Sequence, residues 1–414
     1  MFIEIYAKFK HTKILEALFG DIIMATNTEQ SECGIIPLNK KTKKIHHLIK
    51  APENYSFNLE RKMSWDANEP ATVYKTPEML PDGTTCTAAT VILRTKGCHW
   101  WWTSGCTFCG YFNDTRDDVN SMNLHAQWAY AKQKLDNFSD SEMIKVYTSG
   151  SLFEDREIPV DFQETVLREC HEMGKHLIVE SRTEQNTEEK LAWATSINPY
   201  FTIAIGLEAY DDEVLKFHIN KGFTLKSWHR AVDNIRKYNL RLKTYLMFKP
   251  PFMSEGDALV QCAKWIENVA SLSDEVSVNP MNIQRGTIID RIFRSKEYRP
   301  PWLWSLVDLI ERVNPIIHPG NGMNGDLDQV TRLIIHPTAG GKPRGAHNCG
   351  KCDKEVVAAI ERYSVSGSLG EFKGLNCSCR EIWKEEINLD LQMPIILGCG
   401  KNRRSNSISA NLSP

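Results

Sequence analysis

The chain has 414 residues, of which 42% are hydrophobic and 25% charged, and its formal net charge is -2. These ordinary globular values exclude a disordered or fibrous protein, and the charge excludes a uniformly basic protein that coats nucleic acid. No apolar run approaches the ~20 residues that span a bilayer, and the N-terminal segment is not a secretory signal. We therefore expect a cytoplasmic protein without membrane contact.

Residues 1–80 are polar and irregular and are interpreted as a poorly defined N-terminal extension. From residue 81 onward, short apolar segments alternate with helical ones, which predicts β–α units and a parallel sheet covered by helices. Nearly continuous hydrophobicity fits strands that are buried on both faces. The strands are expected at 89–95, 143–149, 176–181, 201–208, 242–248 and 275–280, and the helices at 122–137, 160–173, 187–195, 224–238, 257–270 and 302–312.

Six β–α units suit a partial (β/α)6 barrel, so the fold class is α/β, with the barrel over residues 81–335. In barrels the chemistry lies at the C-terminal ends of the strands. Polar residues follow the expected strands there: Ser149–Ser151, Glu180–Arg182, Glu208 and, more weakly, Asn279. Residues 336–400 are expected to form a small cysteine-rich metal-binding module, and residues 401–414 a disordered tail.

Three cysteines follow the first barrel strand with the spacing Cys98-x7-Cys106-x2-Cys109. Three thiolates on one loop can hold three irons of a cubane cluster and leave the fourth iron open to an external ligand. A zinc site would need a fourth ligand. The ring of His99 could supply it, but it would reach the metal awkwardly because His99 adjoins Cys98. Three free buried cysteines are the other alternative, but the surrounding Gly, Thr, Ser and Asn residues suit a core poorly. The pattern favours an iron–sulfur site.

Four more cysteines form two pairs, Cys349-x2-Cys352 and Cys377-x-Cys379. Four thiolates in two pairs predict a closed, structural zinc site. An auxiliary iron–sulfur cluster and unligated thiols are the alternatives, and His347 or Cys399 could replace one ligand.

The cysteine loop, with its Cys-x-aromatic-Cys ending, resembles the radical S-adenosylmethionine (radical SAM) superfamily. The usual spacing is x3 and then x2, so the x7 gap departs from it and resembles the branch of the elongator catalytic subunit. The match covers roughly residues 85–335. The other segments that carry it are TSGSLFEDREIP (148–159), VESRTE (179–184), IGLEAYDDEVLKFHINKGFT (205–224) and LKTYLMFKPPF (242–252).

This resemblance implies a 4Fe–4S cluster held by Cys98, Cys106 and Cys109, with SAM on its open iron. An external electron donor would drive cleavage of SAM to a 5′-deoxyadenosyl radical, which takes hydrogen from the substrate.

The resemblance also implies contacts with SAM. Phe108 would pack near the cluster and the adenine, and Ser149, Gly150 and Ser151 would approach the methionine end. Glu180, Ser181 and Arg182 would contact the ribose or the carboxylate. The alternatives are a simple turn at 149–151 and a structural ion pair at 180–182, and Glu208 is ambiguous between SAM contact and structure.

A four-cysteine tail after the barrel, introduced by HPTAGGKPRGAHNCGKCD, resembles the archaeosine biosynthesis radical SAM (RaSEA) family. The upstream cysteine triad of a methylthiotransferase and the acetyltransferase domain of the elongator subunit are not found in the sequence. The resemblance implies a partner subunit that attaches lysine to a 7-cyano-7-deazaguanine base of tRNA. The chain itself would be the lyase-type enzyme that cleaves the lysine carbon–nitrogen bond to leave archaeosine. Our hypothesis is that hydrogen is abstracted from the lysine carbon beside that nitrogen.

Two other functions stay open: a radical SAM enzyme acting on another RNA or a small molecule, and a zinc-stabilised RNA-binding module. With a net charge of -2, a tRNA enzyme must concentrate its basic residues, and the segments 40–44, 342–351 and 401–404 are candidates. Trp100–Trp102 and His99 could stack an extruded base, or the tryptophans could wall off the cluster.

Overall fold

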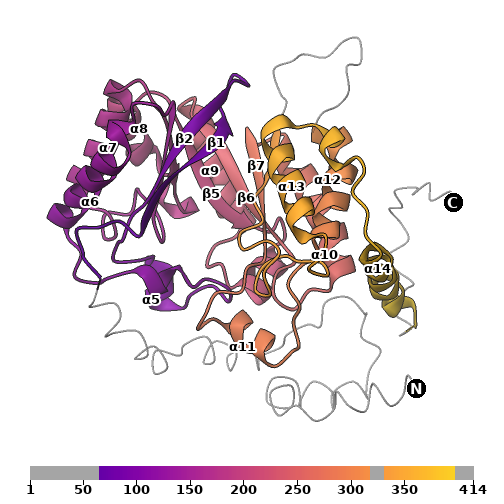
Figure 1. The fold of residues 1–414 in the computed structure, drawn as a ribbon. Helices are drawn as coiled ribbons and strands as arrows, with labels where there is room; N and C mark the ends of the chain where they lie inside the picture. The colour runs from indigo at the N-terminus through magenta and orange to yellow at the C-terminus, as the bar shows by residue number, and fades with distance from the viewer. Residues whose placement is uncertain (1–64, 318–330, 397–414) are drawn as a thin grey trace. The chain divides into compact units, whose positions relative to one another are not determined.

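The computed structural model describes residues 65–317 and 331–396. Most of the expected N-terminal extension and the expected tail at 401–414 lie outside the described residues. Within them the strands are β1 (Thr72–Met79), β2 (Thr85–Ile92), β3 (Met143–Tyr147), β4 (His176–Glu180), β5 (Phe201–Glu208), β6 (Arg241–Phe248), β7 (Glu275–Pro280) and β8 (Arg332–Ile335). They form one sheet in chain order, with β1 antiparallel to β2 and every other neighbouring pair parallel (Figure 1).

The predicted α/β fold with six parallel strands is confirmed as β2 to β7. β5 and β7 have the predicted limits, and the other four differ by a few residues at their ends. Two strands were not predicted. β1 is half-exposed and contains Pro77, so it lacks the continuous apolar run of a central strand, and β8 has only four residues.

The two edges of the sheet approach each other, which makes the sheet a curled partial barrel. Arg332 on β8 donates a hydrogen bond to the carbonyl of Met79 at the end of β1, at 3.2 Å, and lies 3.6 Å from the carboxylate of Glu78. Since β1 and β8 stand at opposite ends of the strand order, this contact curls the sheet around its inner face.

Helices cover the outer face, where Val146, Val179 and Ile203 pack in one core with helix residues such as Phe162 and Trp228 (Figure 1). The α-helices of the described residues are α5 (His99–Thr103), α6 (Ser121–Lys134), α7 (Val160–Glu172), α8 (Glu188–Ile197), α9 (Leu225–Lys237), α10 (Glu255–Ala270), α11 (Ile288–Arg294), α12 (Leu303–Ile317), α13 (Asp353–Ser366) and α14 (Cys379–Ile396). Shorter helical turns are η5 (Tyr111–Asp114), η6 (Asp136–Phe138), η7 (Thr183–Gln185), η8 (Val214–Ile219) and η10 (Leu369–Phe372).

Three helices on the barrel begin at side-chain caps. Thr187, Thr224 and Ser254 each accept a hydrogen bond from an amide in the first turn of α8, α9 and α10. Such caps satisfy amides that have no partner within the helix. The caps of α8 and α9 fix the ends of the connections that follow β4 and β5.

Hydrophobic packing continues from the barrel into the C-terminal region. Cys352, Val356, Tyr363 and Trp383 belong to the same buried cluster as the outer residues of the strands. The described residues up to Asp390 fall in one compact unit. The division into a barrel and a separate C-terminal module stays a prediction.

The inner face of the barrel carries a buried network of charges that the sequence analysis did not predict. The Nζ of Lys145 on β3 lies 2.5 Å from the carboxylate of Glu78 on β1, and the Nζ of Lys243 on β6 lies 3.1 Å from that of Glu275 on β7. Flanking cations and the Lys145 hydrogen bond outweigh burial and lower the pKa of Glu78 to about 2. The first pair reaches across β2, and the second joins the neighbouring strands β6 and β7, so both pairs line the interior of the curled sheet.

In the described part of the chain, none of the helices combines the length and hydrophobicity that crossing a bilayer requires.

Candidate active site and C-terminal cysteine centre

Residues 97–113, here called the cluster loop, follow β2 at the C-terminal end of the barrel strands. Cys98 directly precedes α5, and Cys106 and Cys109 follow the helix. Gly97 and Gly105 have φ angles of +90° and +85°, which side-chain-bearing residues rarely adopt. These two turns let the chain leave the strand and then bend back after α5, so that the three cysteines share one region.

The three thiols are close enough to influence one another. Burial raises the pKa of Cys98 to about 11 and that of Cys109 to about 12, and the neighbouring cysteine thiols add to both shifts. Burial also raises the pKa of Cys106, while Lys221 and Arg182 oppose this shift. Three partly buried thiols near two buried cations are a donor set that fits an anionic iron–sulfur cluster, since the cations compensate its negative charge.

The segment after η8 clamps the cluster loop. The amide of Thr107 donates to the carbonyl of Ile219 at 2.9 Å, and the Nδ2 of Asn220 donates to the carbonyl of Gly105 at 2.6 Å. The indole of Trp100 donates to the carbonyl of Asn220 at 2.8 Å. The loop is thus held by hydrogen bonds to its backbone, which leaves its thiols available as ligands.

Ser149–Ser151 form the turn after β3 that approaches Cys98. A Cβ added to Gly150 would lie 2.8 Å from the Cα of Cys98 and 2.4 Å from the carboxylate of Glu157, so only glycine fits there. Glu157 accepts hydrogen bonds from the amides of Ser149 and Ser151 at 3.2 and 2.9 Å. Burial raises the pKa of Glu157 to about 7. The turn therefore lies beside the cluster loop, as expected, and is organised by an acid that the sequence analysis missed.

Glu180, Ser181 and Arg182 lie at the end of β4. The hydroxyl of Ser181 lies 3.1 Å from that of Ser151, so the two predicted segments meet. Burial raises the pKa of Glu180 to about 8. The guanidinium of Arg182 pairs with Glu184 at 2.5 Å, and it is close enough to Cys98 and Cys106 to lower both thiol pKa values. Contacts of these residues with SAM stay predictions.

Glu208 ends β5 and pairs with Lys221, whose Nζ lies 2.9 Å from the carboxylate. A Cβ added to Gly206 would lie 2.7 Å from Glu208 and 3.0 Å from Lys221, so this pair packs directly against the strand. Burial lowers the pKa of Lys221, but Glu208 and Cys106 more than offset it and raise the value overall. Glu208 is thus paired with a buried cation, and its contact with SAM stays a prediction.

Phe108 packs between the main core and a smaller cluster that contains Met281 and Ile289. The same segment after β7 contacts the cluster loop through polar groups. Gln284 accepts a hydrogen bond from the amide of Gly110, and the side chain of Asn113 donates to the carbonyl of Arg285 at 3.0 Å. Asn279, the weakest candidate, is half-buried near the end of β7.

Glu157, Lys221 and Gln284 are the site residues that sequence reasoning did not single out. Glu157 and Lys221 fall within segments 148–159 and 205–224, which carry the resemblance to the radical SAM superfamily, so the sequence indicated these regions but not the two residues. Their roles depend on which amide or carboxylate the fold brings to them, and spacing alone does not carry that information.

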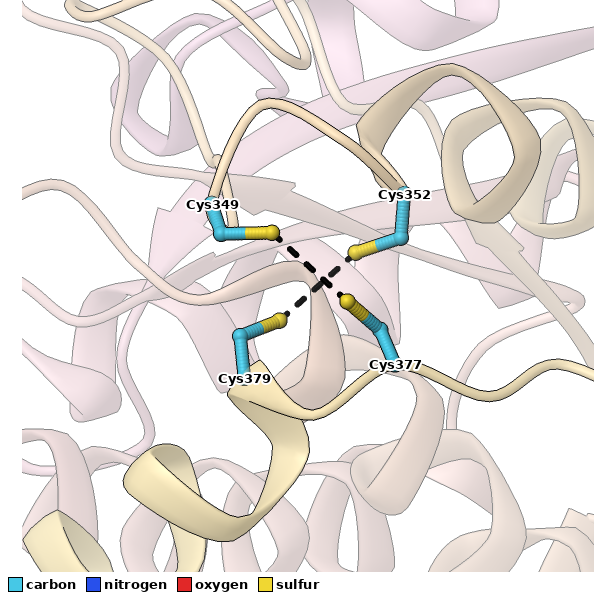
Figure 2. A group of neighbouring side chains, drawn as sticks. All are labelled: Cys349, Cys352, Cys377 and Cys379. Atoms are coloured by element: carbon cyan, nitrogen blue, oxygen red, sulfur yellow. Dashed lines mark hydrogen bonds between the residues drawn. The ribbon is translucent and has the colours of Figure 1, made fainter.

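The four C-terminal cysteines converge on one point (Figure 2). Their sulfurs all lie within 4.8 Å of one another; the Cys349–Cys377 distance is 3.6 Å and the Cys352–Cys379 distance 3.7 Å. Cys352 and Cys379 are buried, and Cys349 is exposed. The predicted ligand set is thus brought together and could hold a metal ion.

Neighbouring donors support this centre. The indole of Trp304 on α12 donates to the sulfur of Cys379 at 3.2 Å, and the side-chain amide of Asn348 donates to that of Cys352 at 3.3 Å. Hydrogen bonds to sulfur stabilise the thiolate form that a metal requires. His347 turns its Nδ1 to the carbonyl of Gly345 at 2.8 Å and is not part of the four-sulfur group, and Cys399 lies outside the described residues.

Of the basic segments considered for RNA contact, 40–44 and 401–404 lie outside the described residues. Lys342 and Lys351 of the third segment are exposed, and Arg344 pairs with Asp290 through a 2.5 Å contact.

Comparison with known proteins finds close relatives over most of the chain. The chain is 32% identical to archaeosine synthase subunit beta of Methanosarcina acetivorans, over 78% of this chain and 91% of that protein. It is 30% identical to the protein of the same name from Thermococcus kodakarensis, over 75% of this chain and 95% of that protein. No family model matches the sequence. Among solved structures, the archaeal Elp3 of Methanocaldococcus infernus covers 61% of this chain and 60% of its own, with 15% identity and a TM-score of 0.43.

Proposed function

The chain belongs to the family of archaeosine synthase subunit beta, and on this premise we propose that it is a radical SAM enzyme of tRNA modification. The observation that carries the proposal is the cluster loop, in which Cys98, Cys106 and Cys109 lie together and face the cations Arg182 and Lys221. The three cysteines would hold a 4Fe–4S cluster that, with SAM, supplies a 5′-deoxyadenosyl radical.

The residues of the chain prepare this site in three ways. The segment after η8 and the segment after β7 fix the cluster loop by hydrogen bonds to its backbone. Glu157 holds the turn at 149–151 against Cys98 and accepts a hydrogen bond from the hydroxyl of Thr95 at 2.6 Å. Arg182 and Lys221 place positive charge beside the thiols. The arrangement supports a site in which the turn at 149–151 packs closely against the cluster loop and buried charges balance the cluster.

For the substrate we propose tRNA that carries lysine on a 7-deazaguanine base. The enzyme would break the carbon–nitrogen bond of that lysine, so that the nitrogen remains on the base as part of archaeosine and the lysine carbon skeleton leaves. A second subunit would attach the lysine beforehand, which agrees with the name "subunit beta" of the two relatives. An external protein or chemical reductant would supply the electron.

For the C-terminal cysteines we propose one structural zinc ion. Zinc–sulfur bonds of ≈ 2.3 Å in a tetrahedron place the sulfurs about 3.8 Å apart, and the distances of 3.6 and 3.7 Å agree with that geometry. All four positions are filled by cysteines, which is typical of structural rather than catalytic zinc.

The test is anaerobic reconstitution followed by electron spin resonance of the reduced protein, with and without SAM. We expect a cubane signal that shifts when SAM is added and that is lost in a Cys98→Ala/Cys106→Ala/Cys109→Ala variant. Cys170→Ala is the control, because Cys170 is a buried cysteine on α7 and not part of the cluster loop. A colourless wild-type protein that binds only zinc would refute the proposal and favour an RNA-binding module.

The substrate is tested separately with tRNA to which lysine has been attached enzymatically. Formation of archaeosine and 5′-deoxyadenosine by the reconstituted wild type supports the proposed reaction. A cluster that cleaves SAM without changing this tRNA would indicate a radical SAM enzyme with a different substrate.

A further inference from the structure

The three consecutive tryptophans of the cluster loop have different environments. The indole of Trp100 donates to the carbonyl of Asn220, and its ring is so close to Gly222 that an added Cβ would lie 2.5 Å from it. Trp100 therefore fills the contact between two loops and has a structural role.

Trp101 and Trp102 form an aromatic group with Phe112. The rings of Trp101 and Phe112 stack in parallel, and Trp102 stands edge-on to both, with interplanar angles of 89° and 88°. The indole of Trp102 also donates to the carbonyl of Lys96 at 3.2 Å. Trp102 is thus held in place, yet it is 55% exposed. A fixed, exposed tryptophan loses little conformational entropy when a ligand stacks on it.

A cavity lies beside this ring, and a second cavity adjoins the first. One has a volume of about 450 Å³ and is lined partly by Lys96, Trp102 and Asp117, and the other, of about 330 Å³, reaches Lys190. The two share His99, Glu154 and Arg156, so together they form one depression with charged side chains in its lining.

The charged groups of this depression are mixed. Lys190 pairs with Asp155 at 2.7 Å, and the Nδ1 of His99 lies 2.9 Å from the carboxylate of Glu154. Arg156 is exposed and completes the lining. A depression with both donors and acceptors beside an aromatic face suits the edges and faces of unpaired bases better than a row of phosphates.

We propose that Trp102 and the adjoining depression bind unpaired nucleotides of the RNA substrate, with one base stacked on Trp102. This inference rests on the proposed function for the identity of the RNA. His99 lines the depression and directly follows Cys98. A nucleotide next to the base stacked on Trp102 would therefore lie near Cys98. The surface would orient the loop that presents the modified base.

The test measures the affinity of the reconstituted protein for a tRNA transcript and for a short oligonucleotide with the sequence of its target loop. Stacking contributes enough per base that Trp102→Ala should bind about tenfold to a hundredfold more weakly, and Trp102→Phe should retain most of the affinity. Salt dependence adds a second readout. Trp102→Ala should leave the slope of log affinity against log salt unchanged, and Arg156→Ala should reduce it by at most about one.

Tyr200→Ala is the matched control, because Tyr200 is 48% exposed and precedes β5 at the opposite end of the barrel strands. Iron content and the cluster signal are compared on the same preparations, so that a misfolded loop is recognised. Photocrosslinking of 4-thiouridine RNA to the wild type gives an independent test and should label the peptide with Trp102.

The outcomes separate the two proposals. Unchanged affinity of Trp102→Ala, together with normal archaeosine formation, would overturn the binding surface and leave the proposed function intact. A second outcome is that Trp102→Ala loses oligonucleotide binding while the wild type fails to convert lysine-bearing tRNA. This result would support the binding surface and refute the proposed reaction. Slower reduction of the cluster by a protein donor, with unchanged RNA affinity, would assign the surface to the reductant and overturn the inference.

Discussion

The side-chain oxygen of Gln284 accepts a hydrogen bond from the amide of Gly110 at 2.5 Å, although 174 residues separate them. A Cβ added to Gly110 would lie 2.6 Å from the Cβ of Gln284. This contact joins the segment after β7 to the cluster loop, one residue beyond Cys109. Because it depends on the lack of a side chain at residue 110, it is sensitive to very small substitutions.

Gly110→Ala should therefore displace one of the two segments. Overpacking of this kind costs about 1–3 kcal/mol, and the iron bound after reconstitution should fall with it. Gln284→Ala removes the hydrogen bond without creating an overlap and should cost only about 1 kcal/mol. Urea unfolding of the apo protein and iron analysis of the reconstituted protein check both values. Equal effects of the two variants would show that the close packing is not the important feature.

The Lys221–Glu208 pair should be strongly coupled. Lys221→Met leaves the buried carboxylate of Glu208 without its cation, which costs about 3–5 kcal/mol of folding free energy for a buried pair. Lys221→Met/Glu208→Gln removes both charges and should recover a large part of that loss. A double-mutant cycle from denaturant unfolding measures the coupling, and additive effects of the two substitutions would contradict it.

Removal of metal from the four-cysteine centre should destabilise the C-terminal region. Binding to the native state alone stabilises by about 4 kcal/mol when free zinc exceeds its Kd a thousandfold. A chelator should therefore lower the Tm of the wild type and release one zinc ion per chain. In Cys352→Ala the Tm should be low already and insensitive to chelator, whereas Cys170→Ala should respond like the wild type. A wild-type Tm that chelator does not change would argue against a structural metal.

Stability should fall in mild acid because of His176. Burial, with a contribution from Arg241, lowers the pKa of this histidine to about 4, below its ordinary value of about 6.5. As pH falls from 6.5 towards 4, His176 binds a proton in the unfolded chain but not in the native state. The stability present at pH 7 is therefore lost in this window. The loss from this group between pH 7 and pH 5 is at most about 2 kcal/mol.

His176→Gln should reduce that dependence and keep a hydrogen-bonding partner for the hydroxyl of Thr202, which lies 2.8 Å from the Nε2 of His176. The measurement is the difference in unfolding free energy between pH 7 and pH 5 for the variant and the wild type. Other titrating groups, including His336 with its similarly lowered pKa, are present in both proteins and cancel in the comparison. The same acid sensitivity in both proteins would contradict the assignment.

The sequence determined the features that local spacing encodes. Periodic apolar runs marked β2 to β7, because a strand buried on both faces needs continuous hydrophobicity. The two cysteine groups were visible because metal ligands recur at short intervals along a chain. Within the structure Cys349, Cys352, Cys377 and Cys379 meet as that spacing predicted.

Only the tertiary structure decided which distant groups meet. β1 stayed hidden because a half-exposed antiparallel edge strand needs no continuous apolar run, and the buried Lys145–Glu78 pair became visible only when β3 and β1 curled around one interior. The same holds for Glu157 beneath the turn at 149–151 and for Gln284 against Gly110. A carboxylate or an amide acquires such a role from the partner that folding brings within about 3 Å of it, and nothing in its neighbours along the chain specifies that partner.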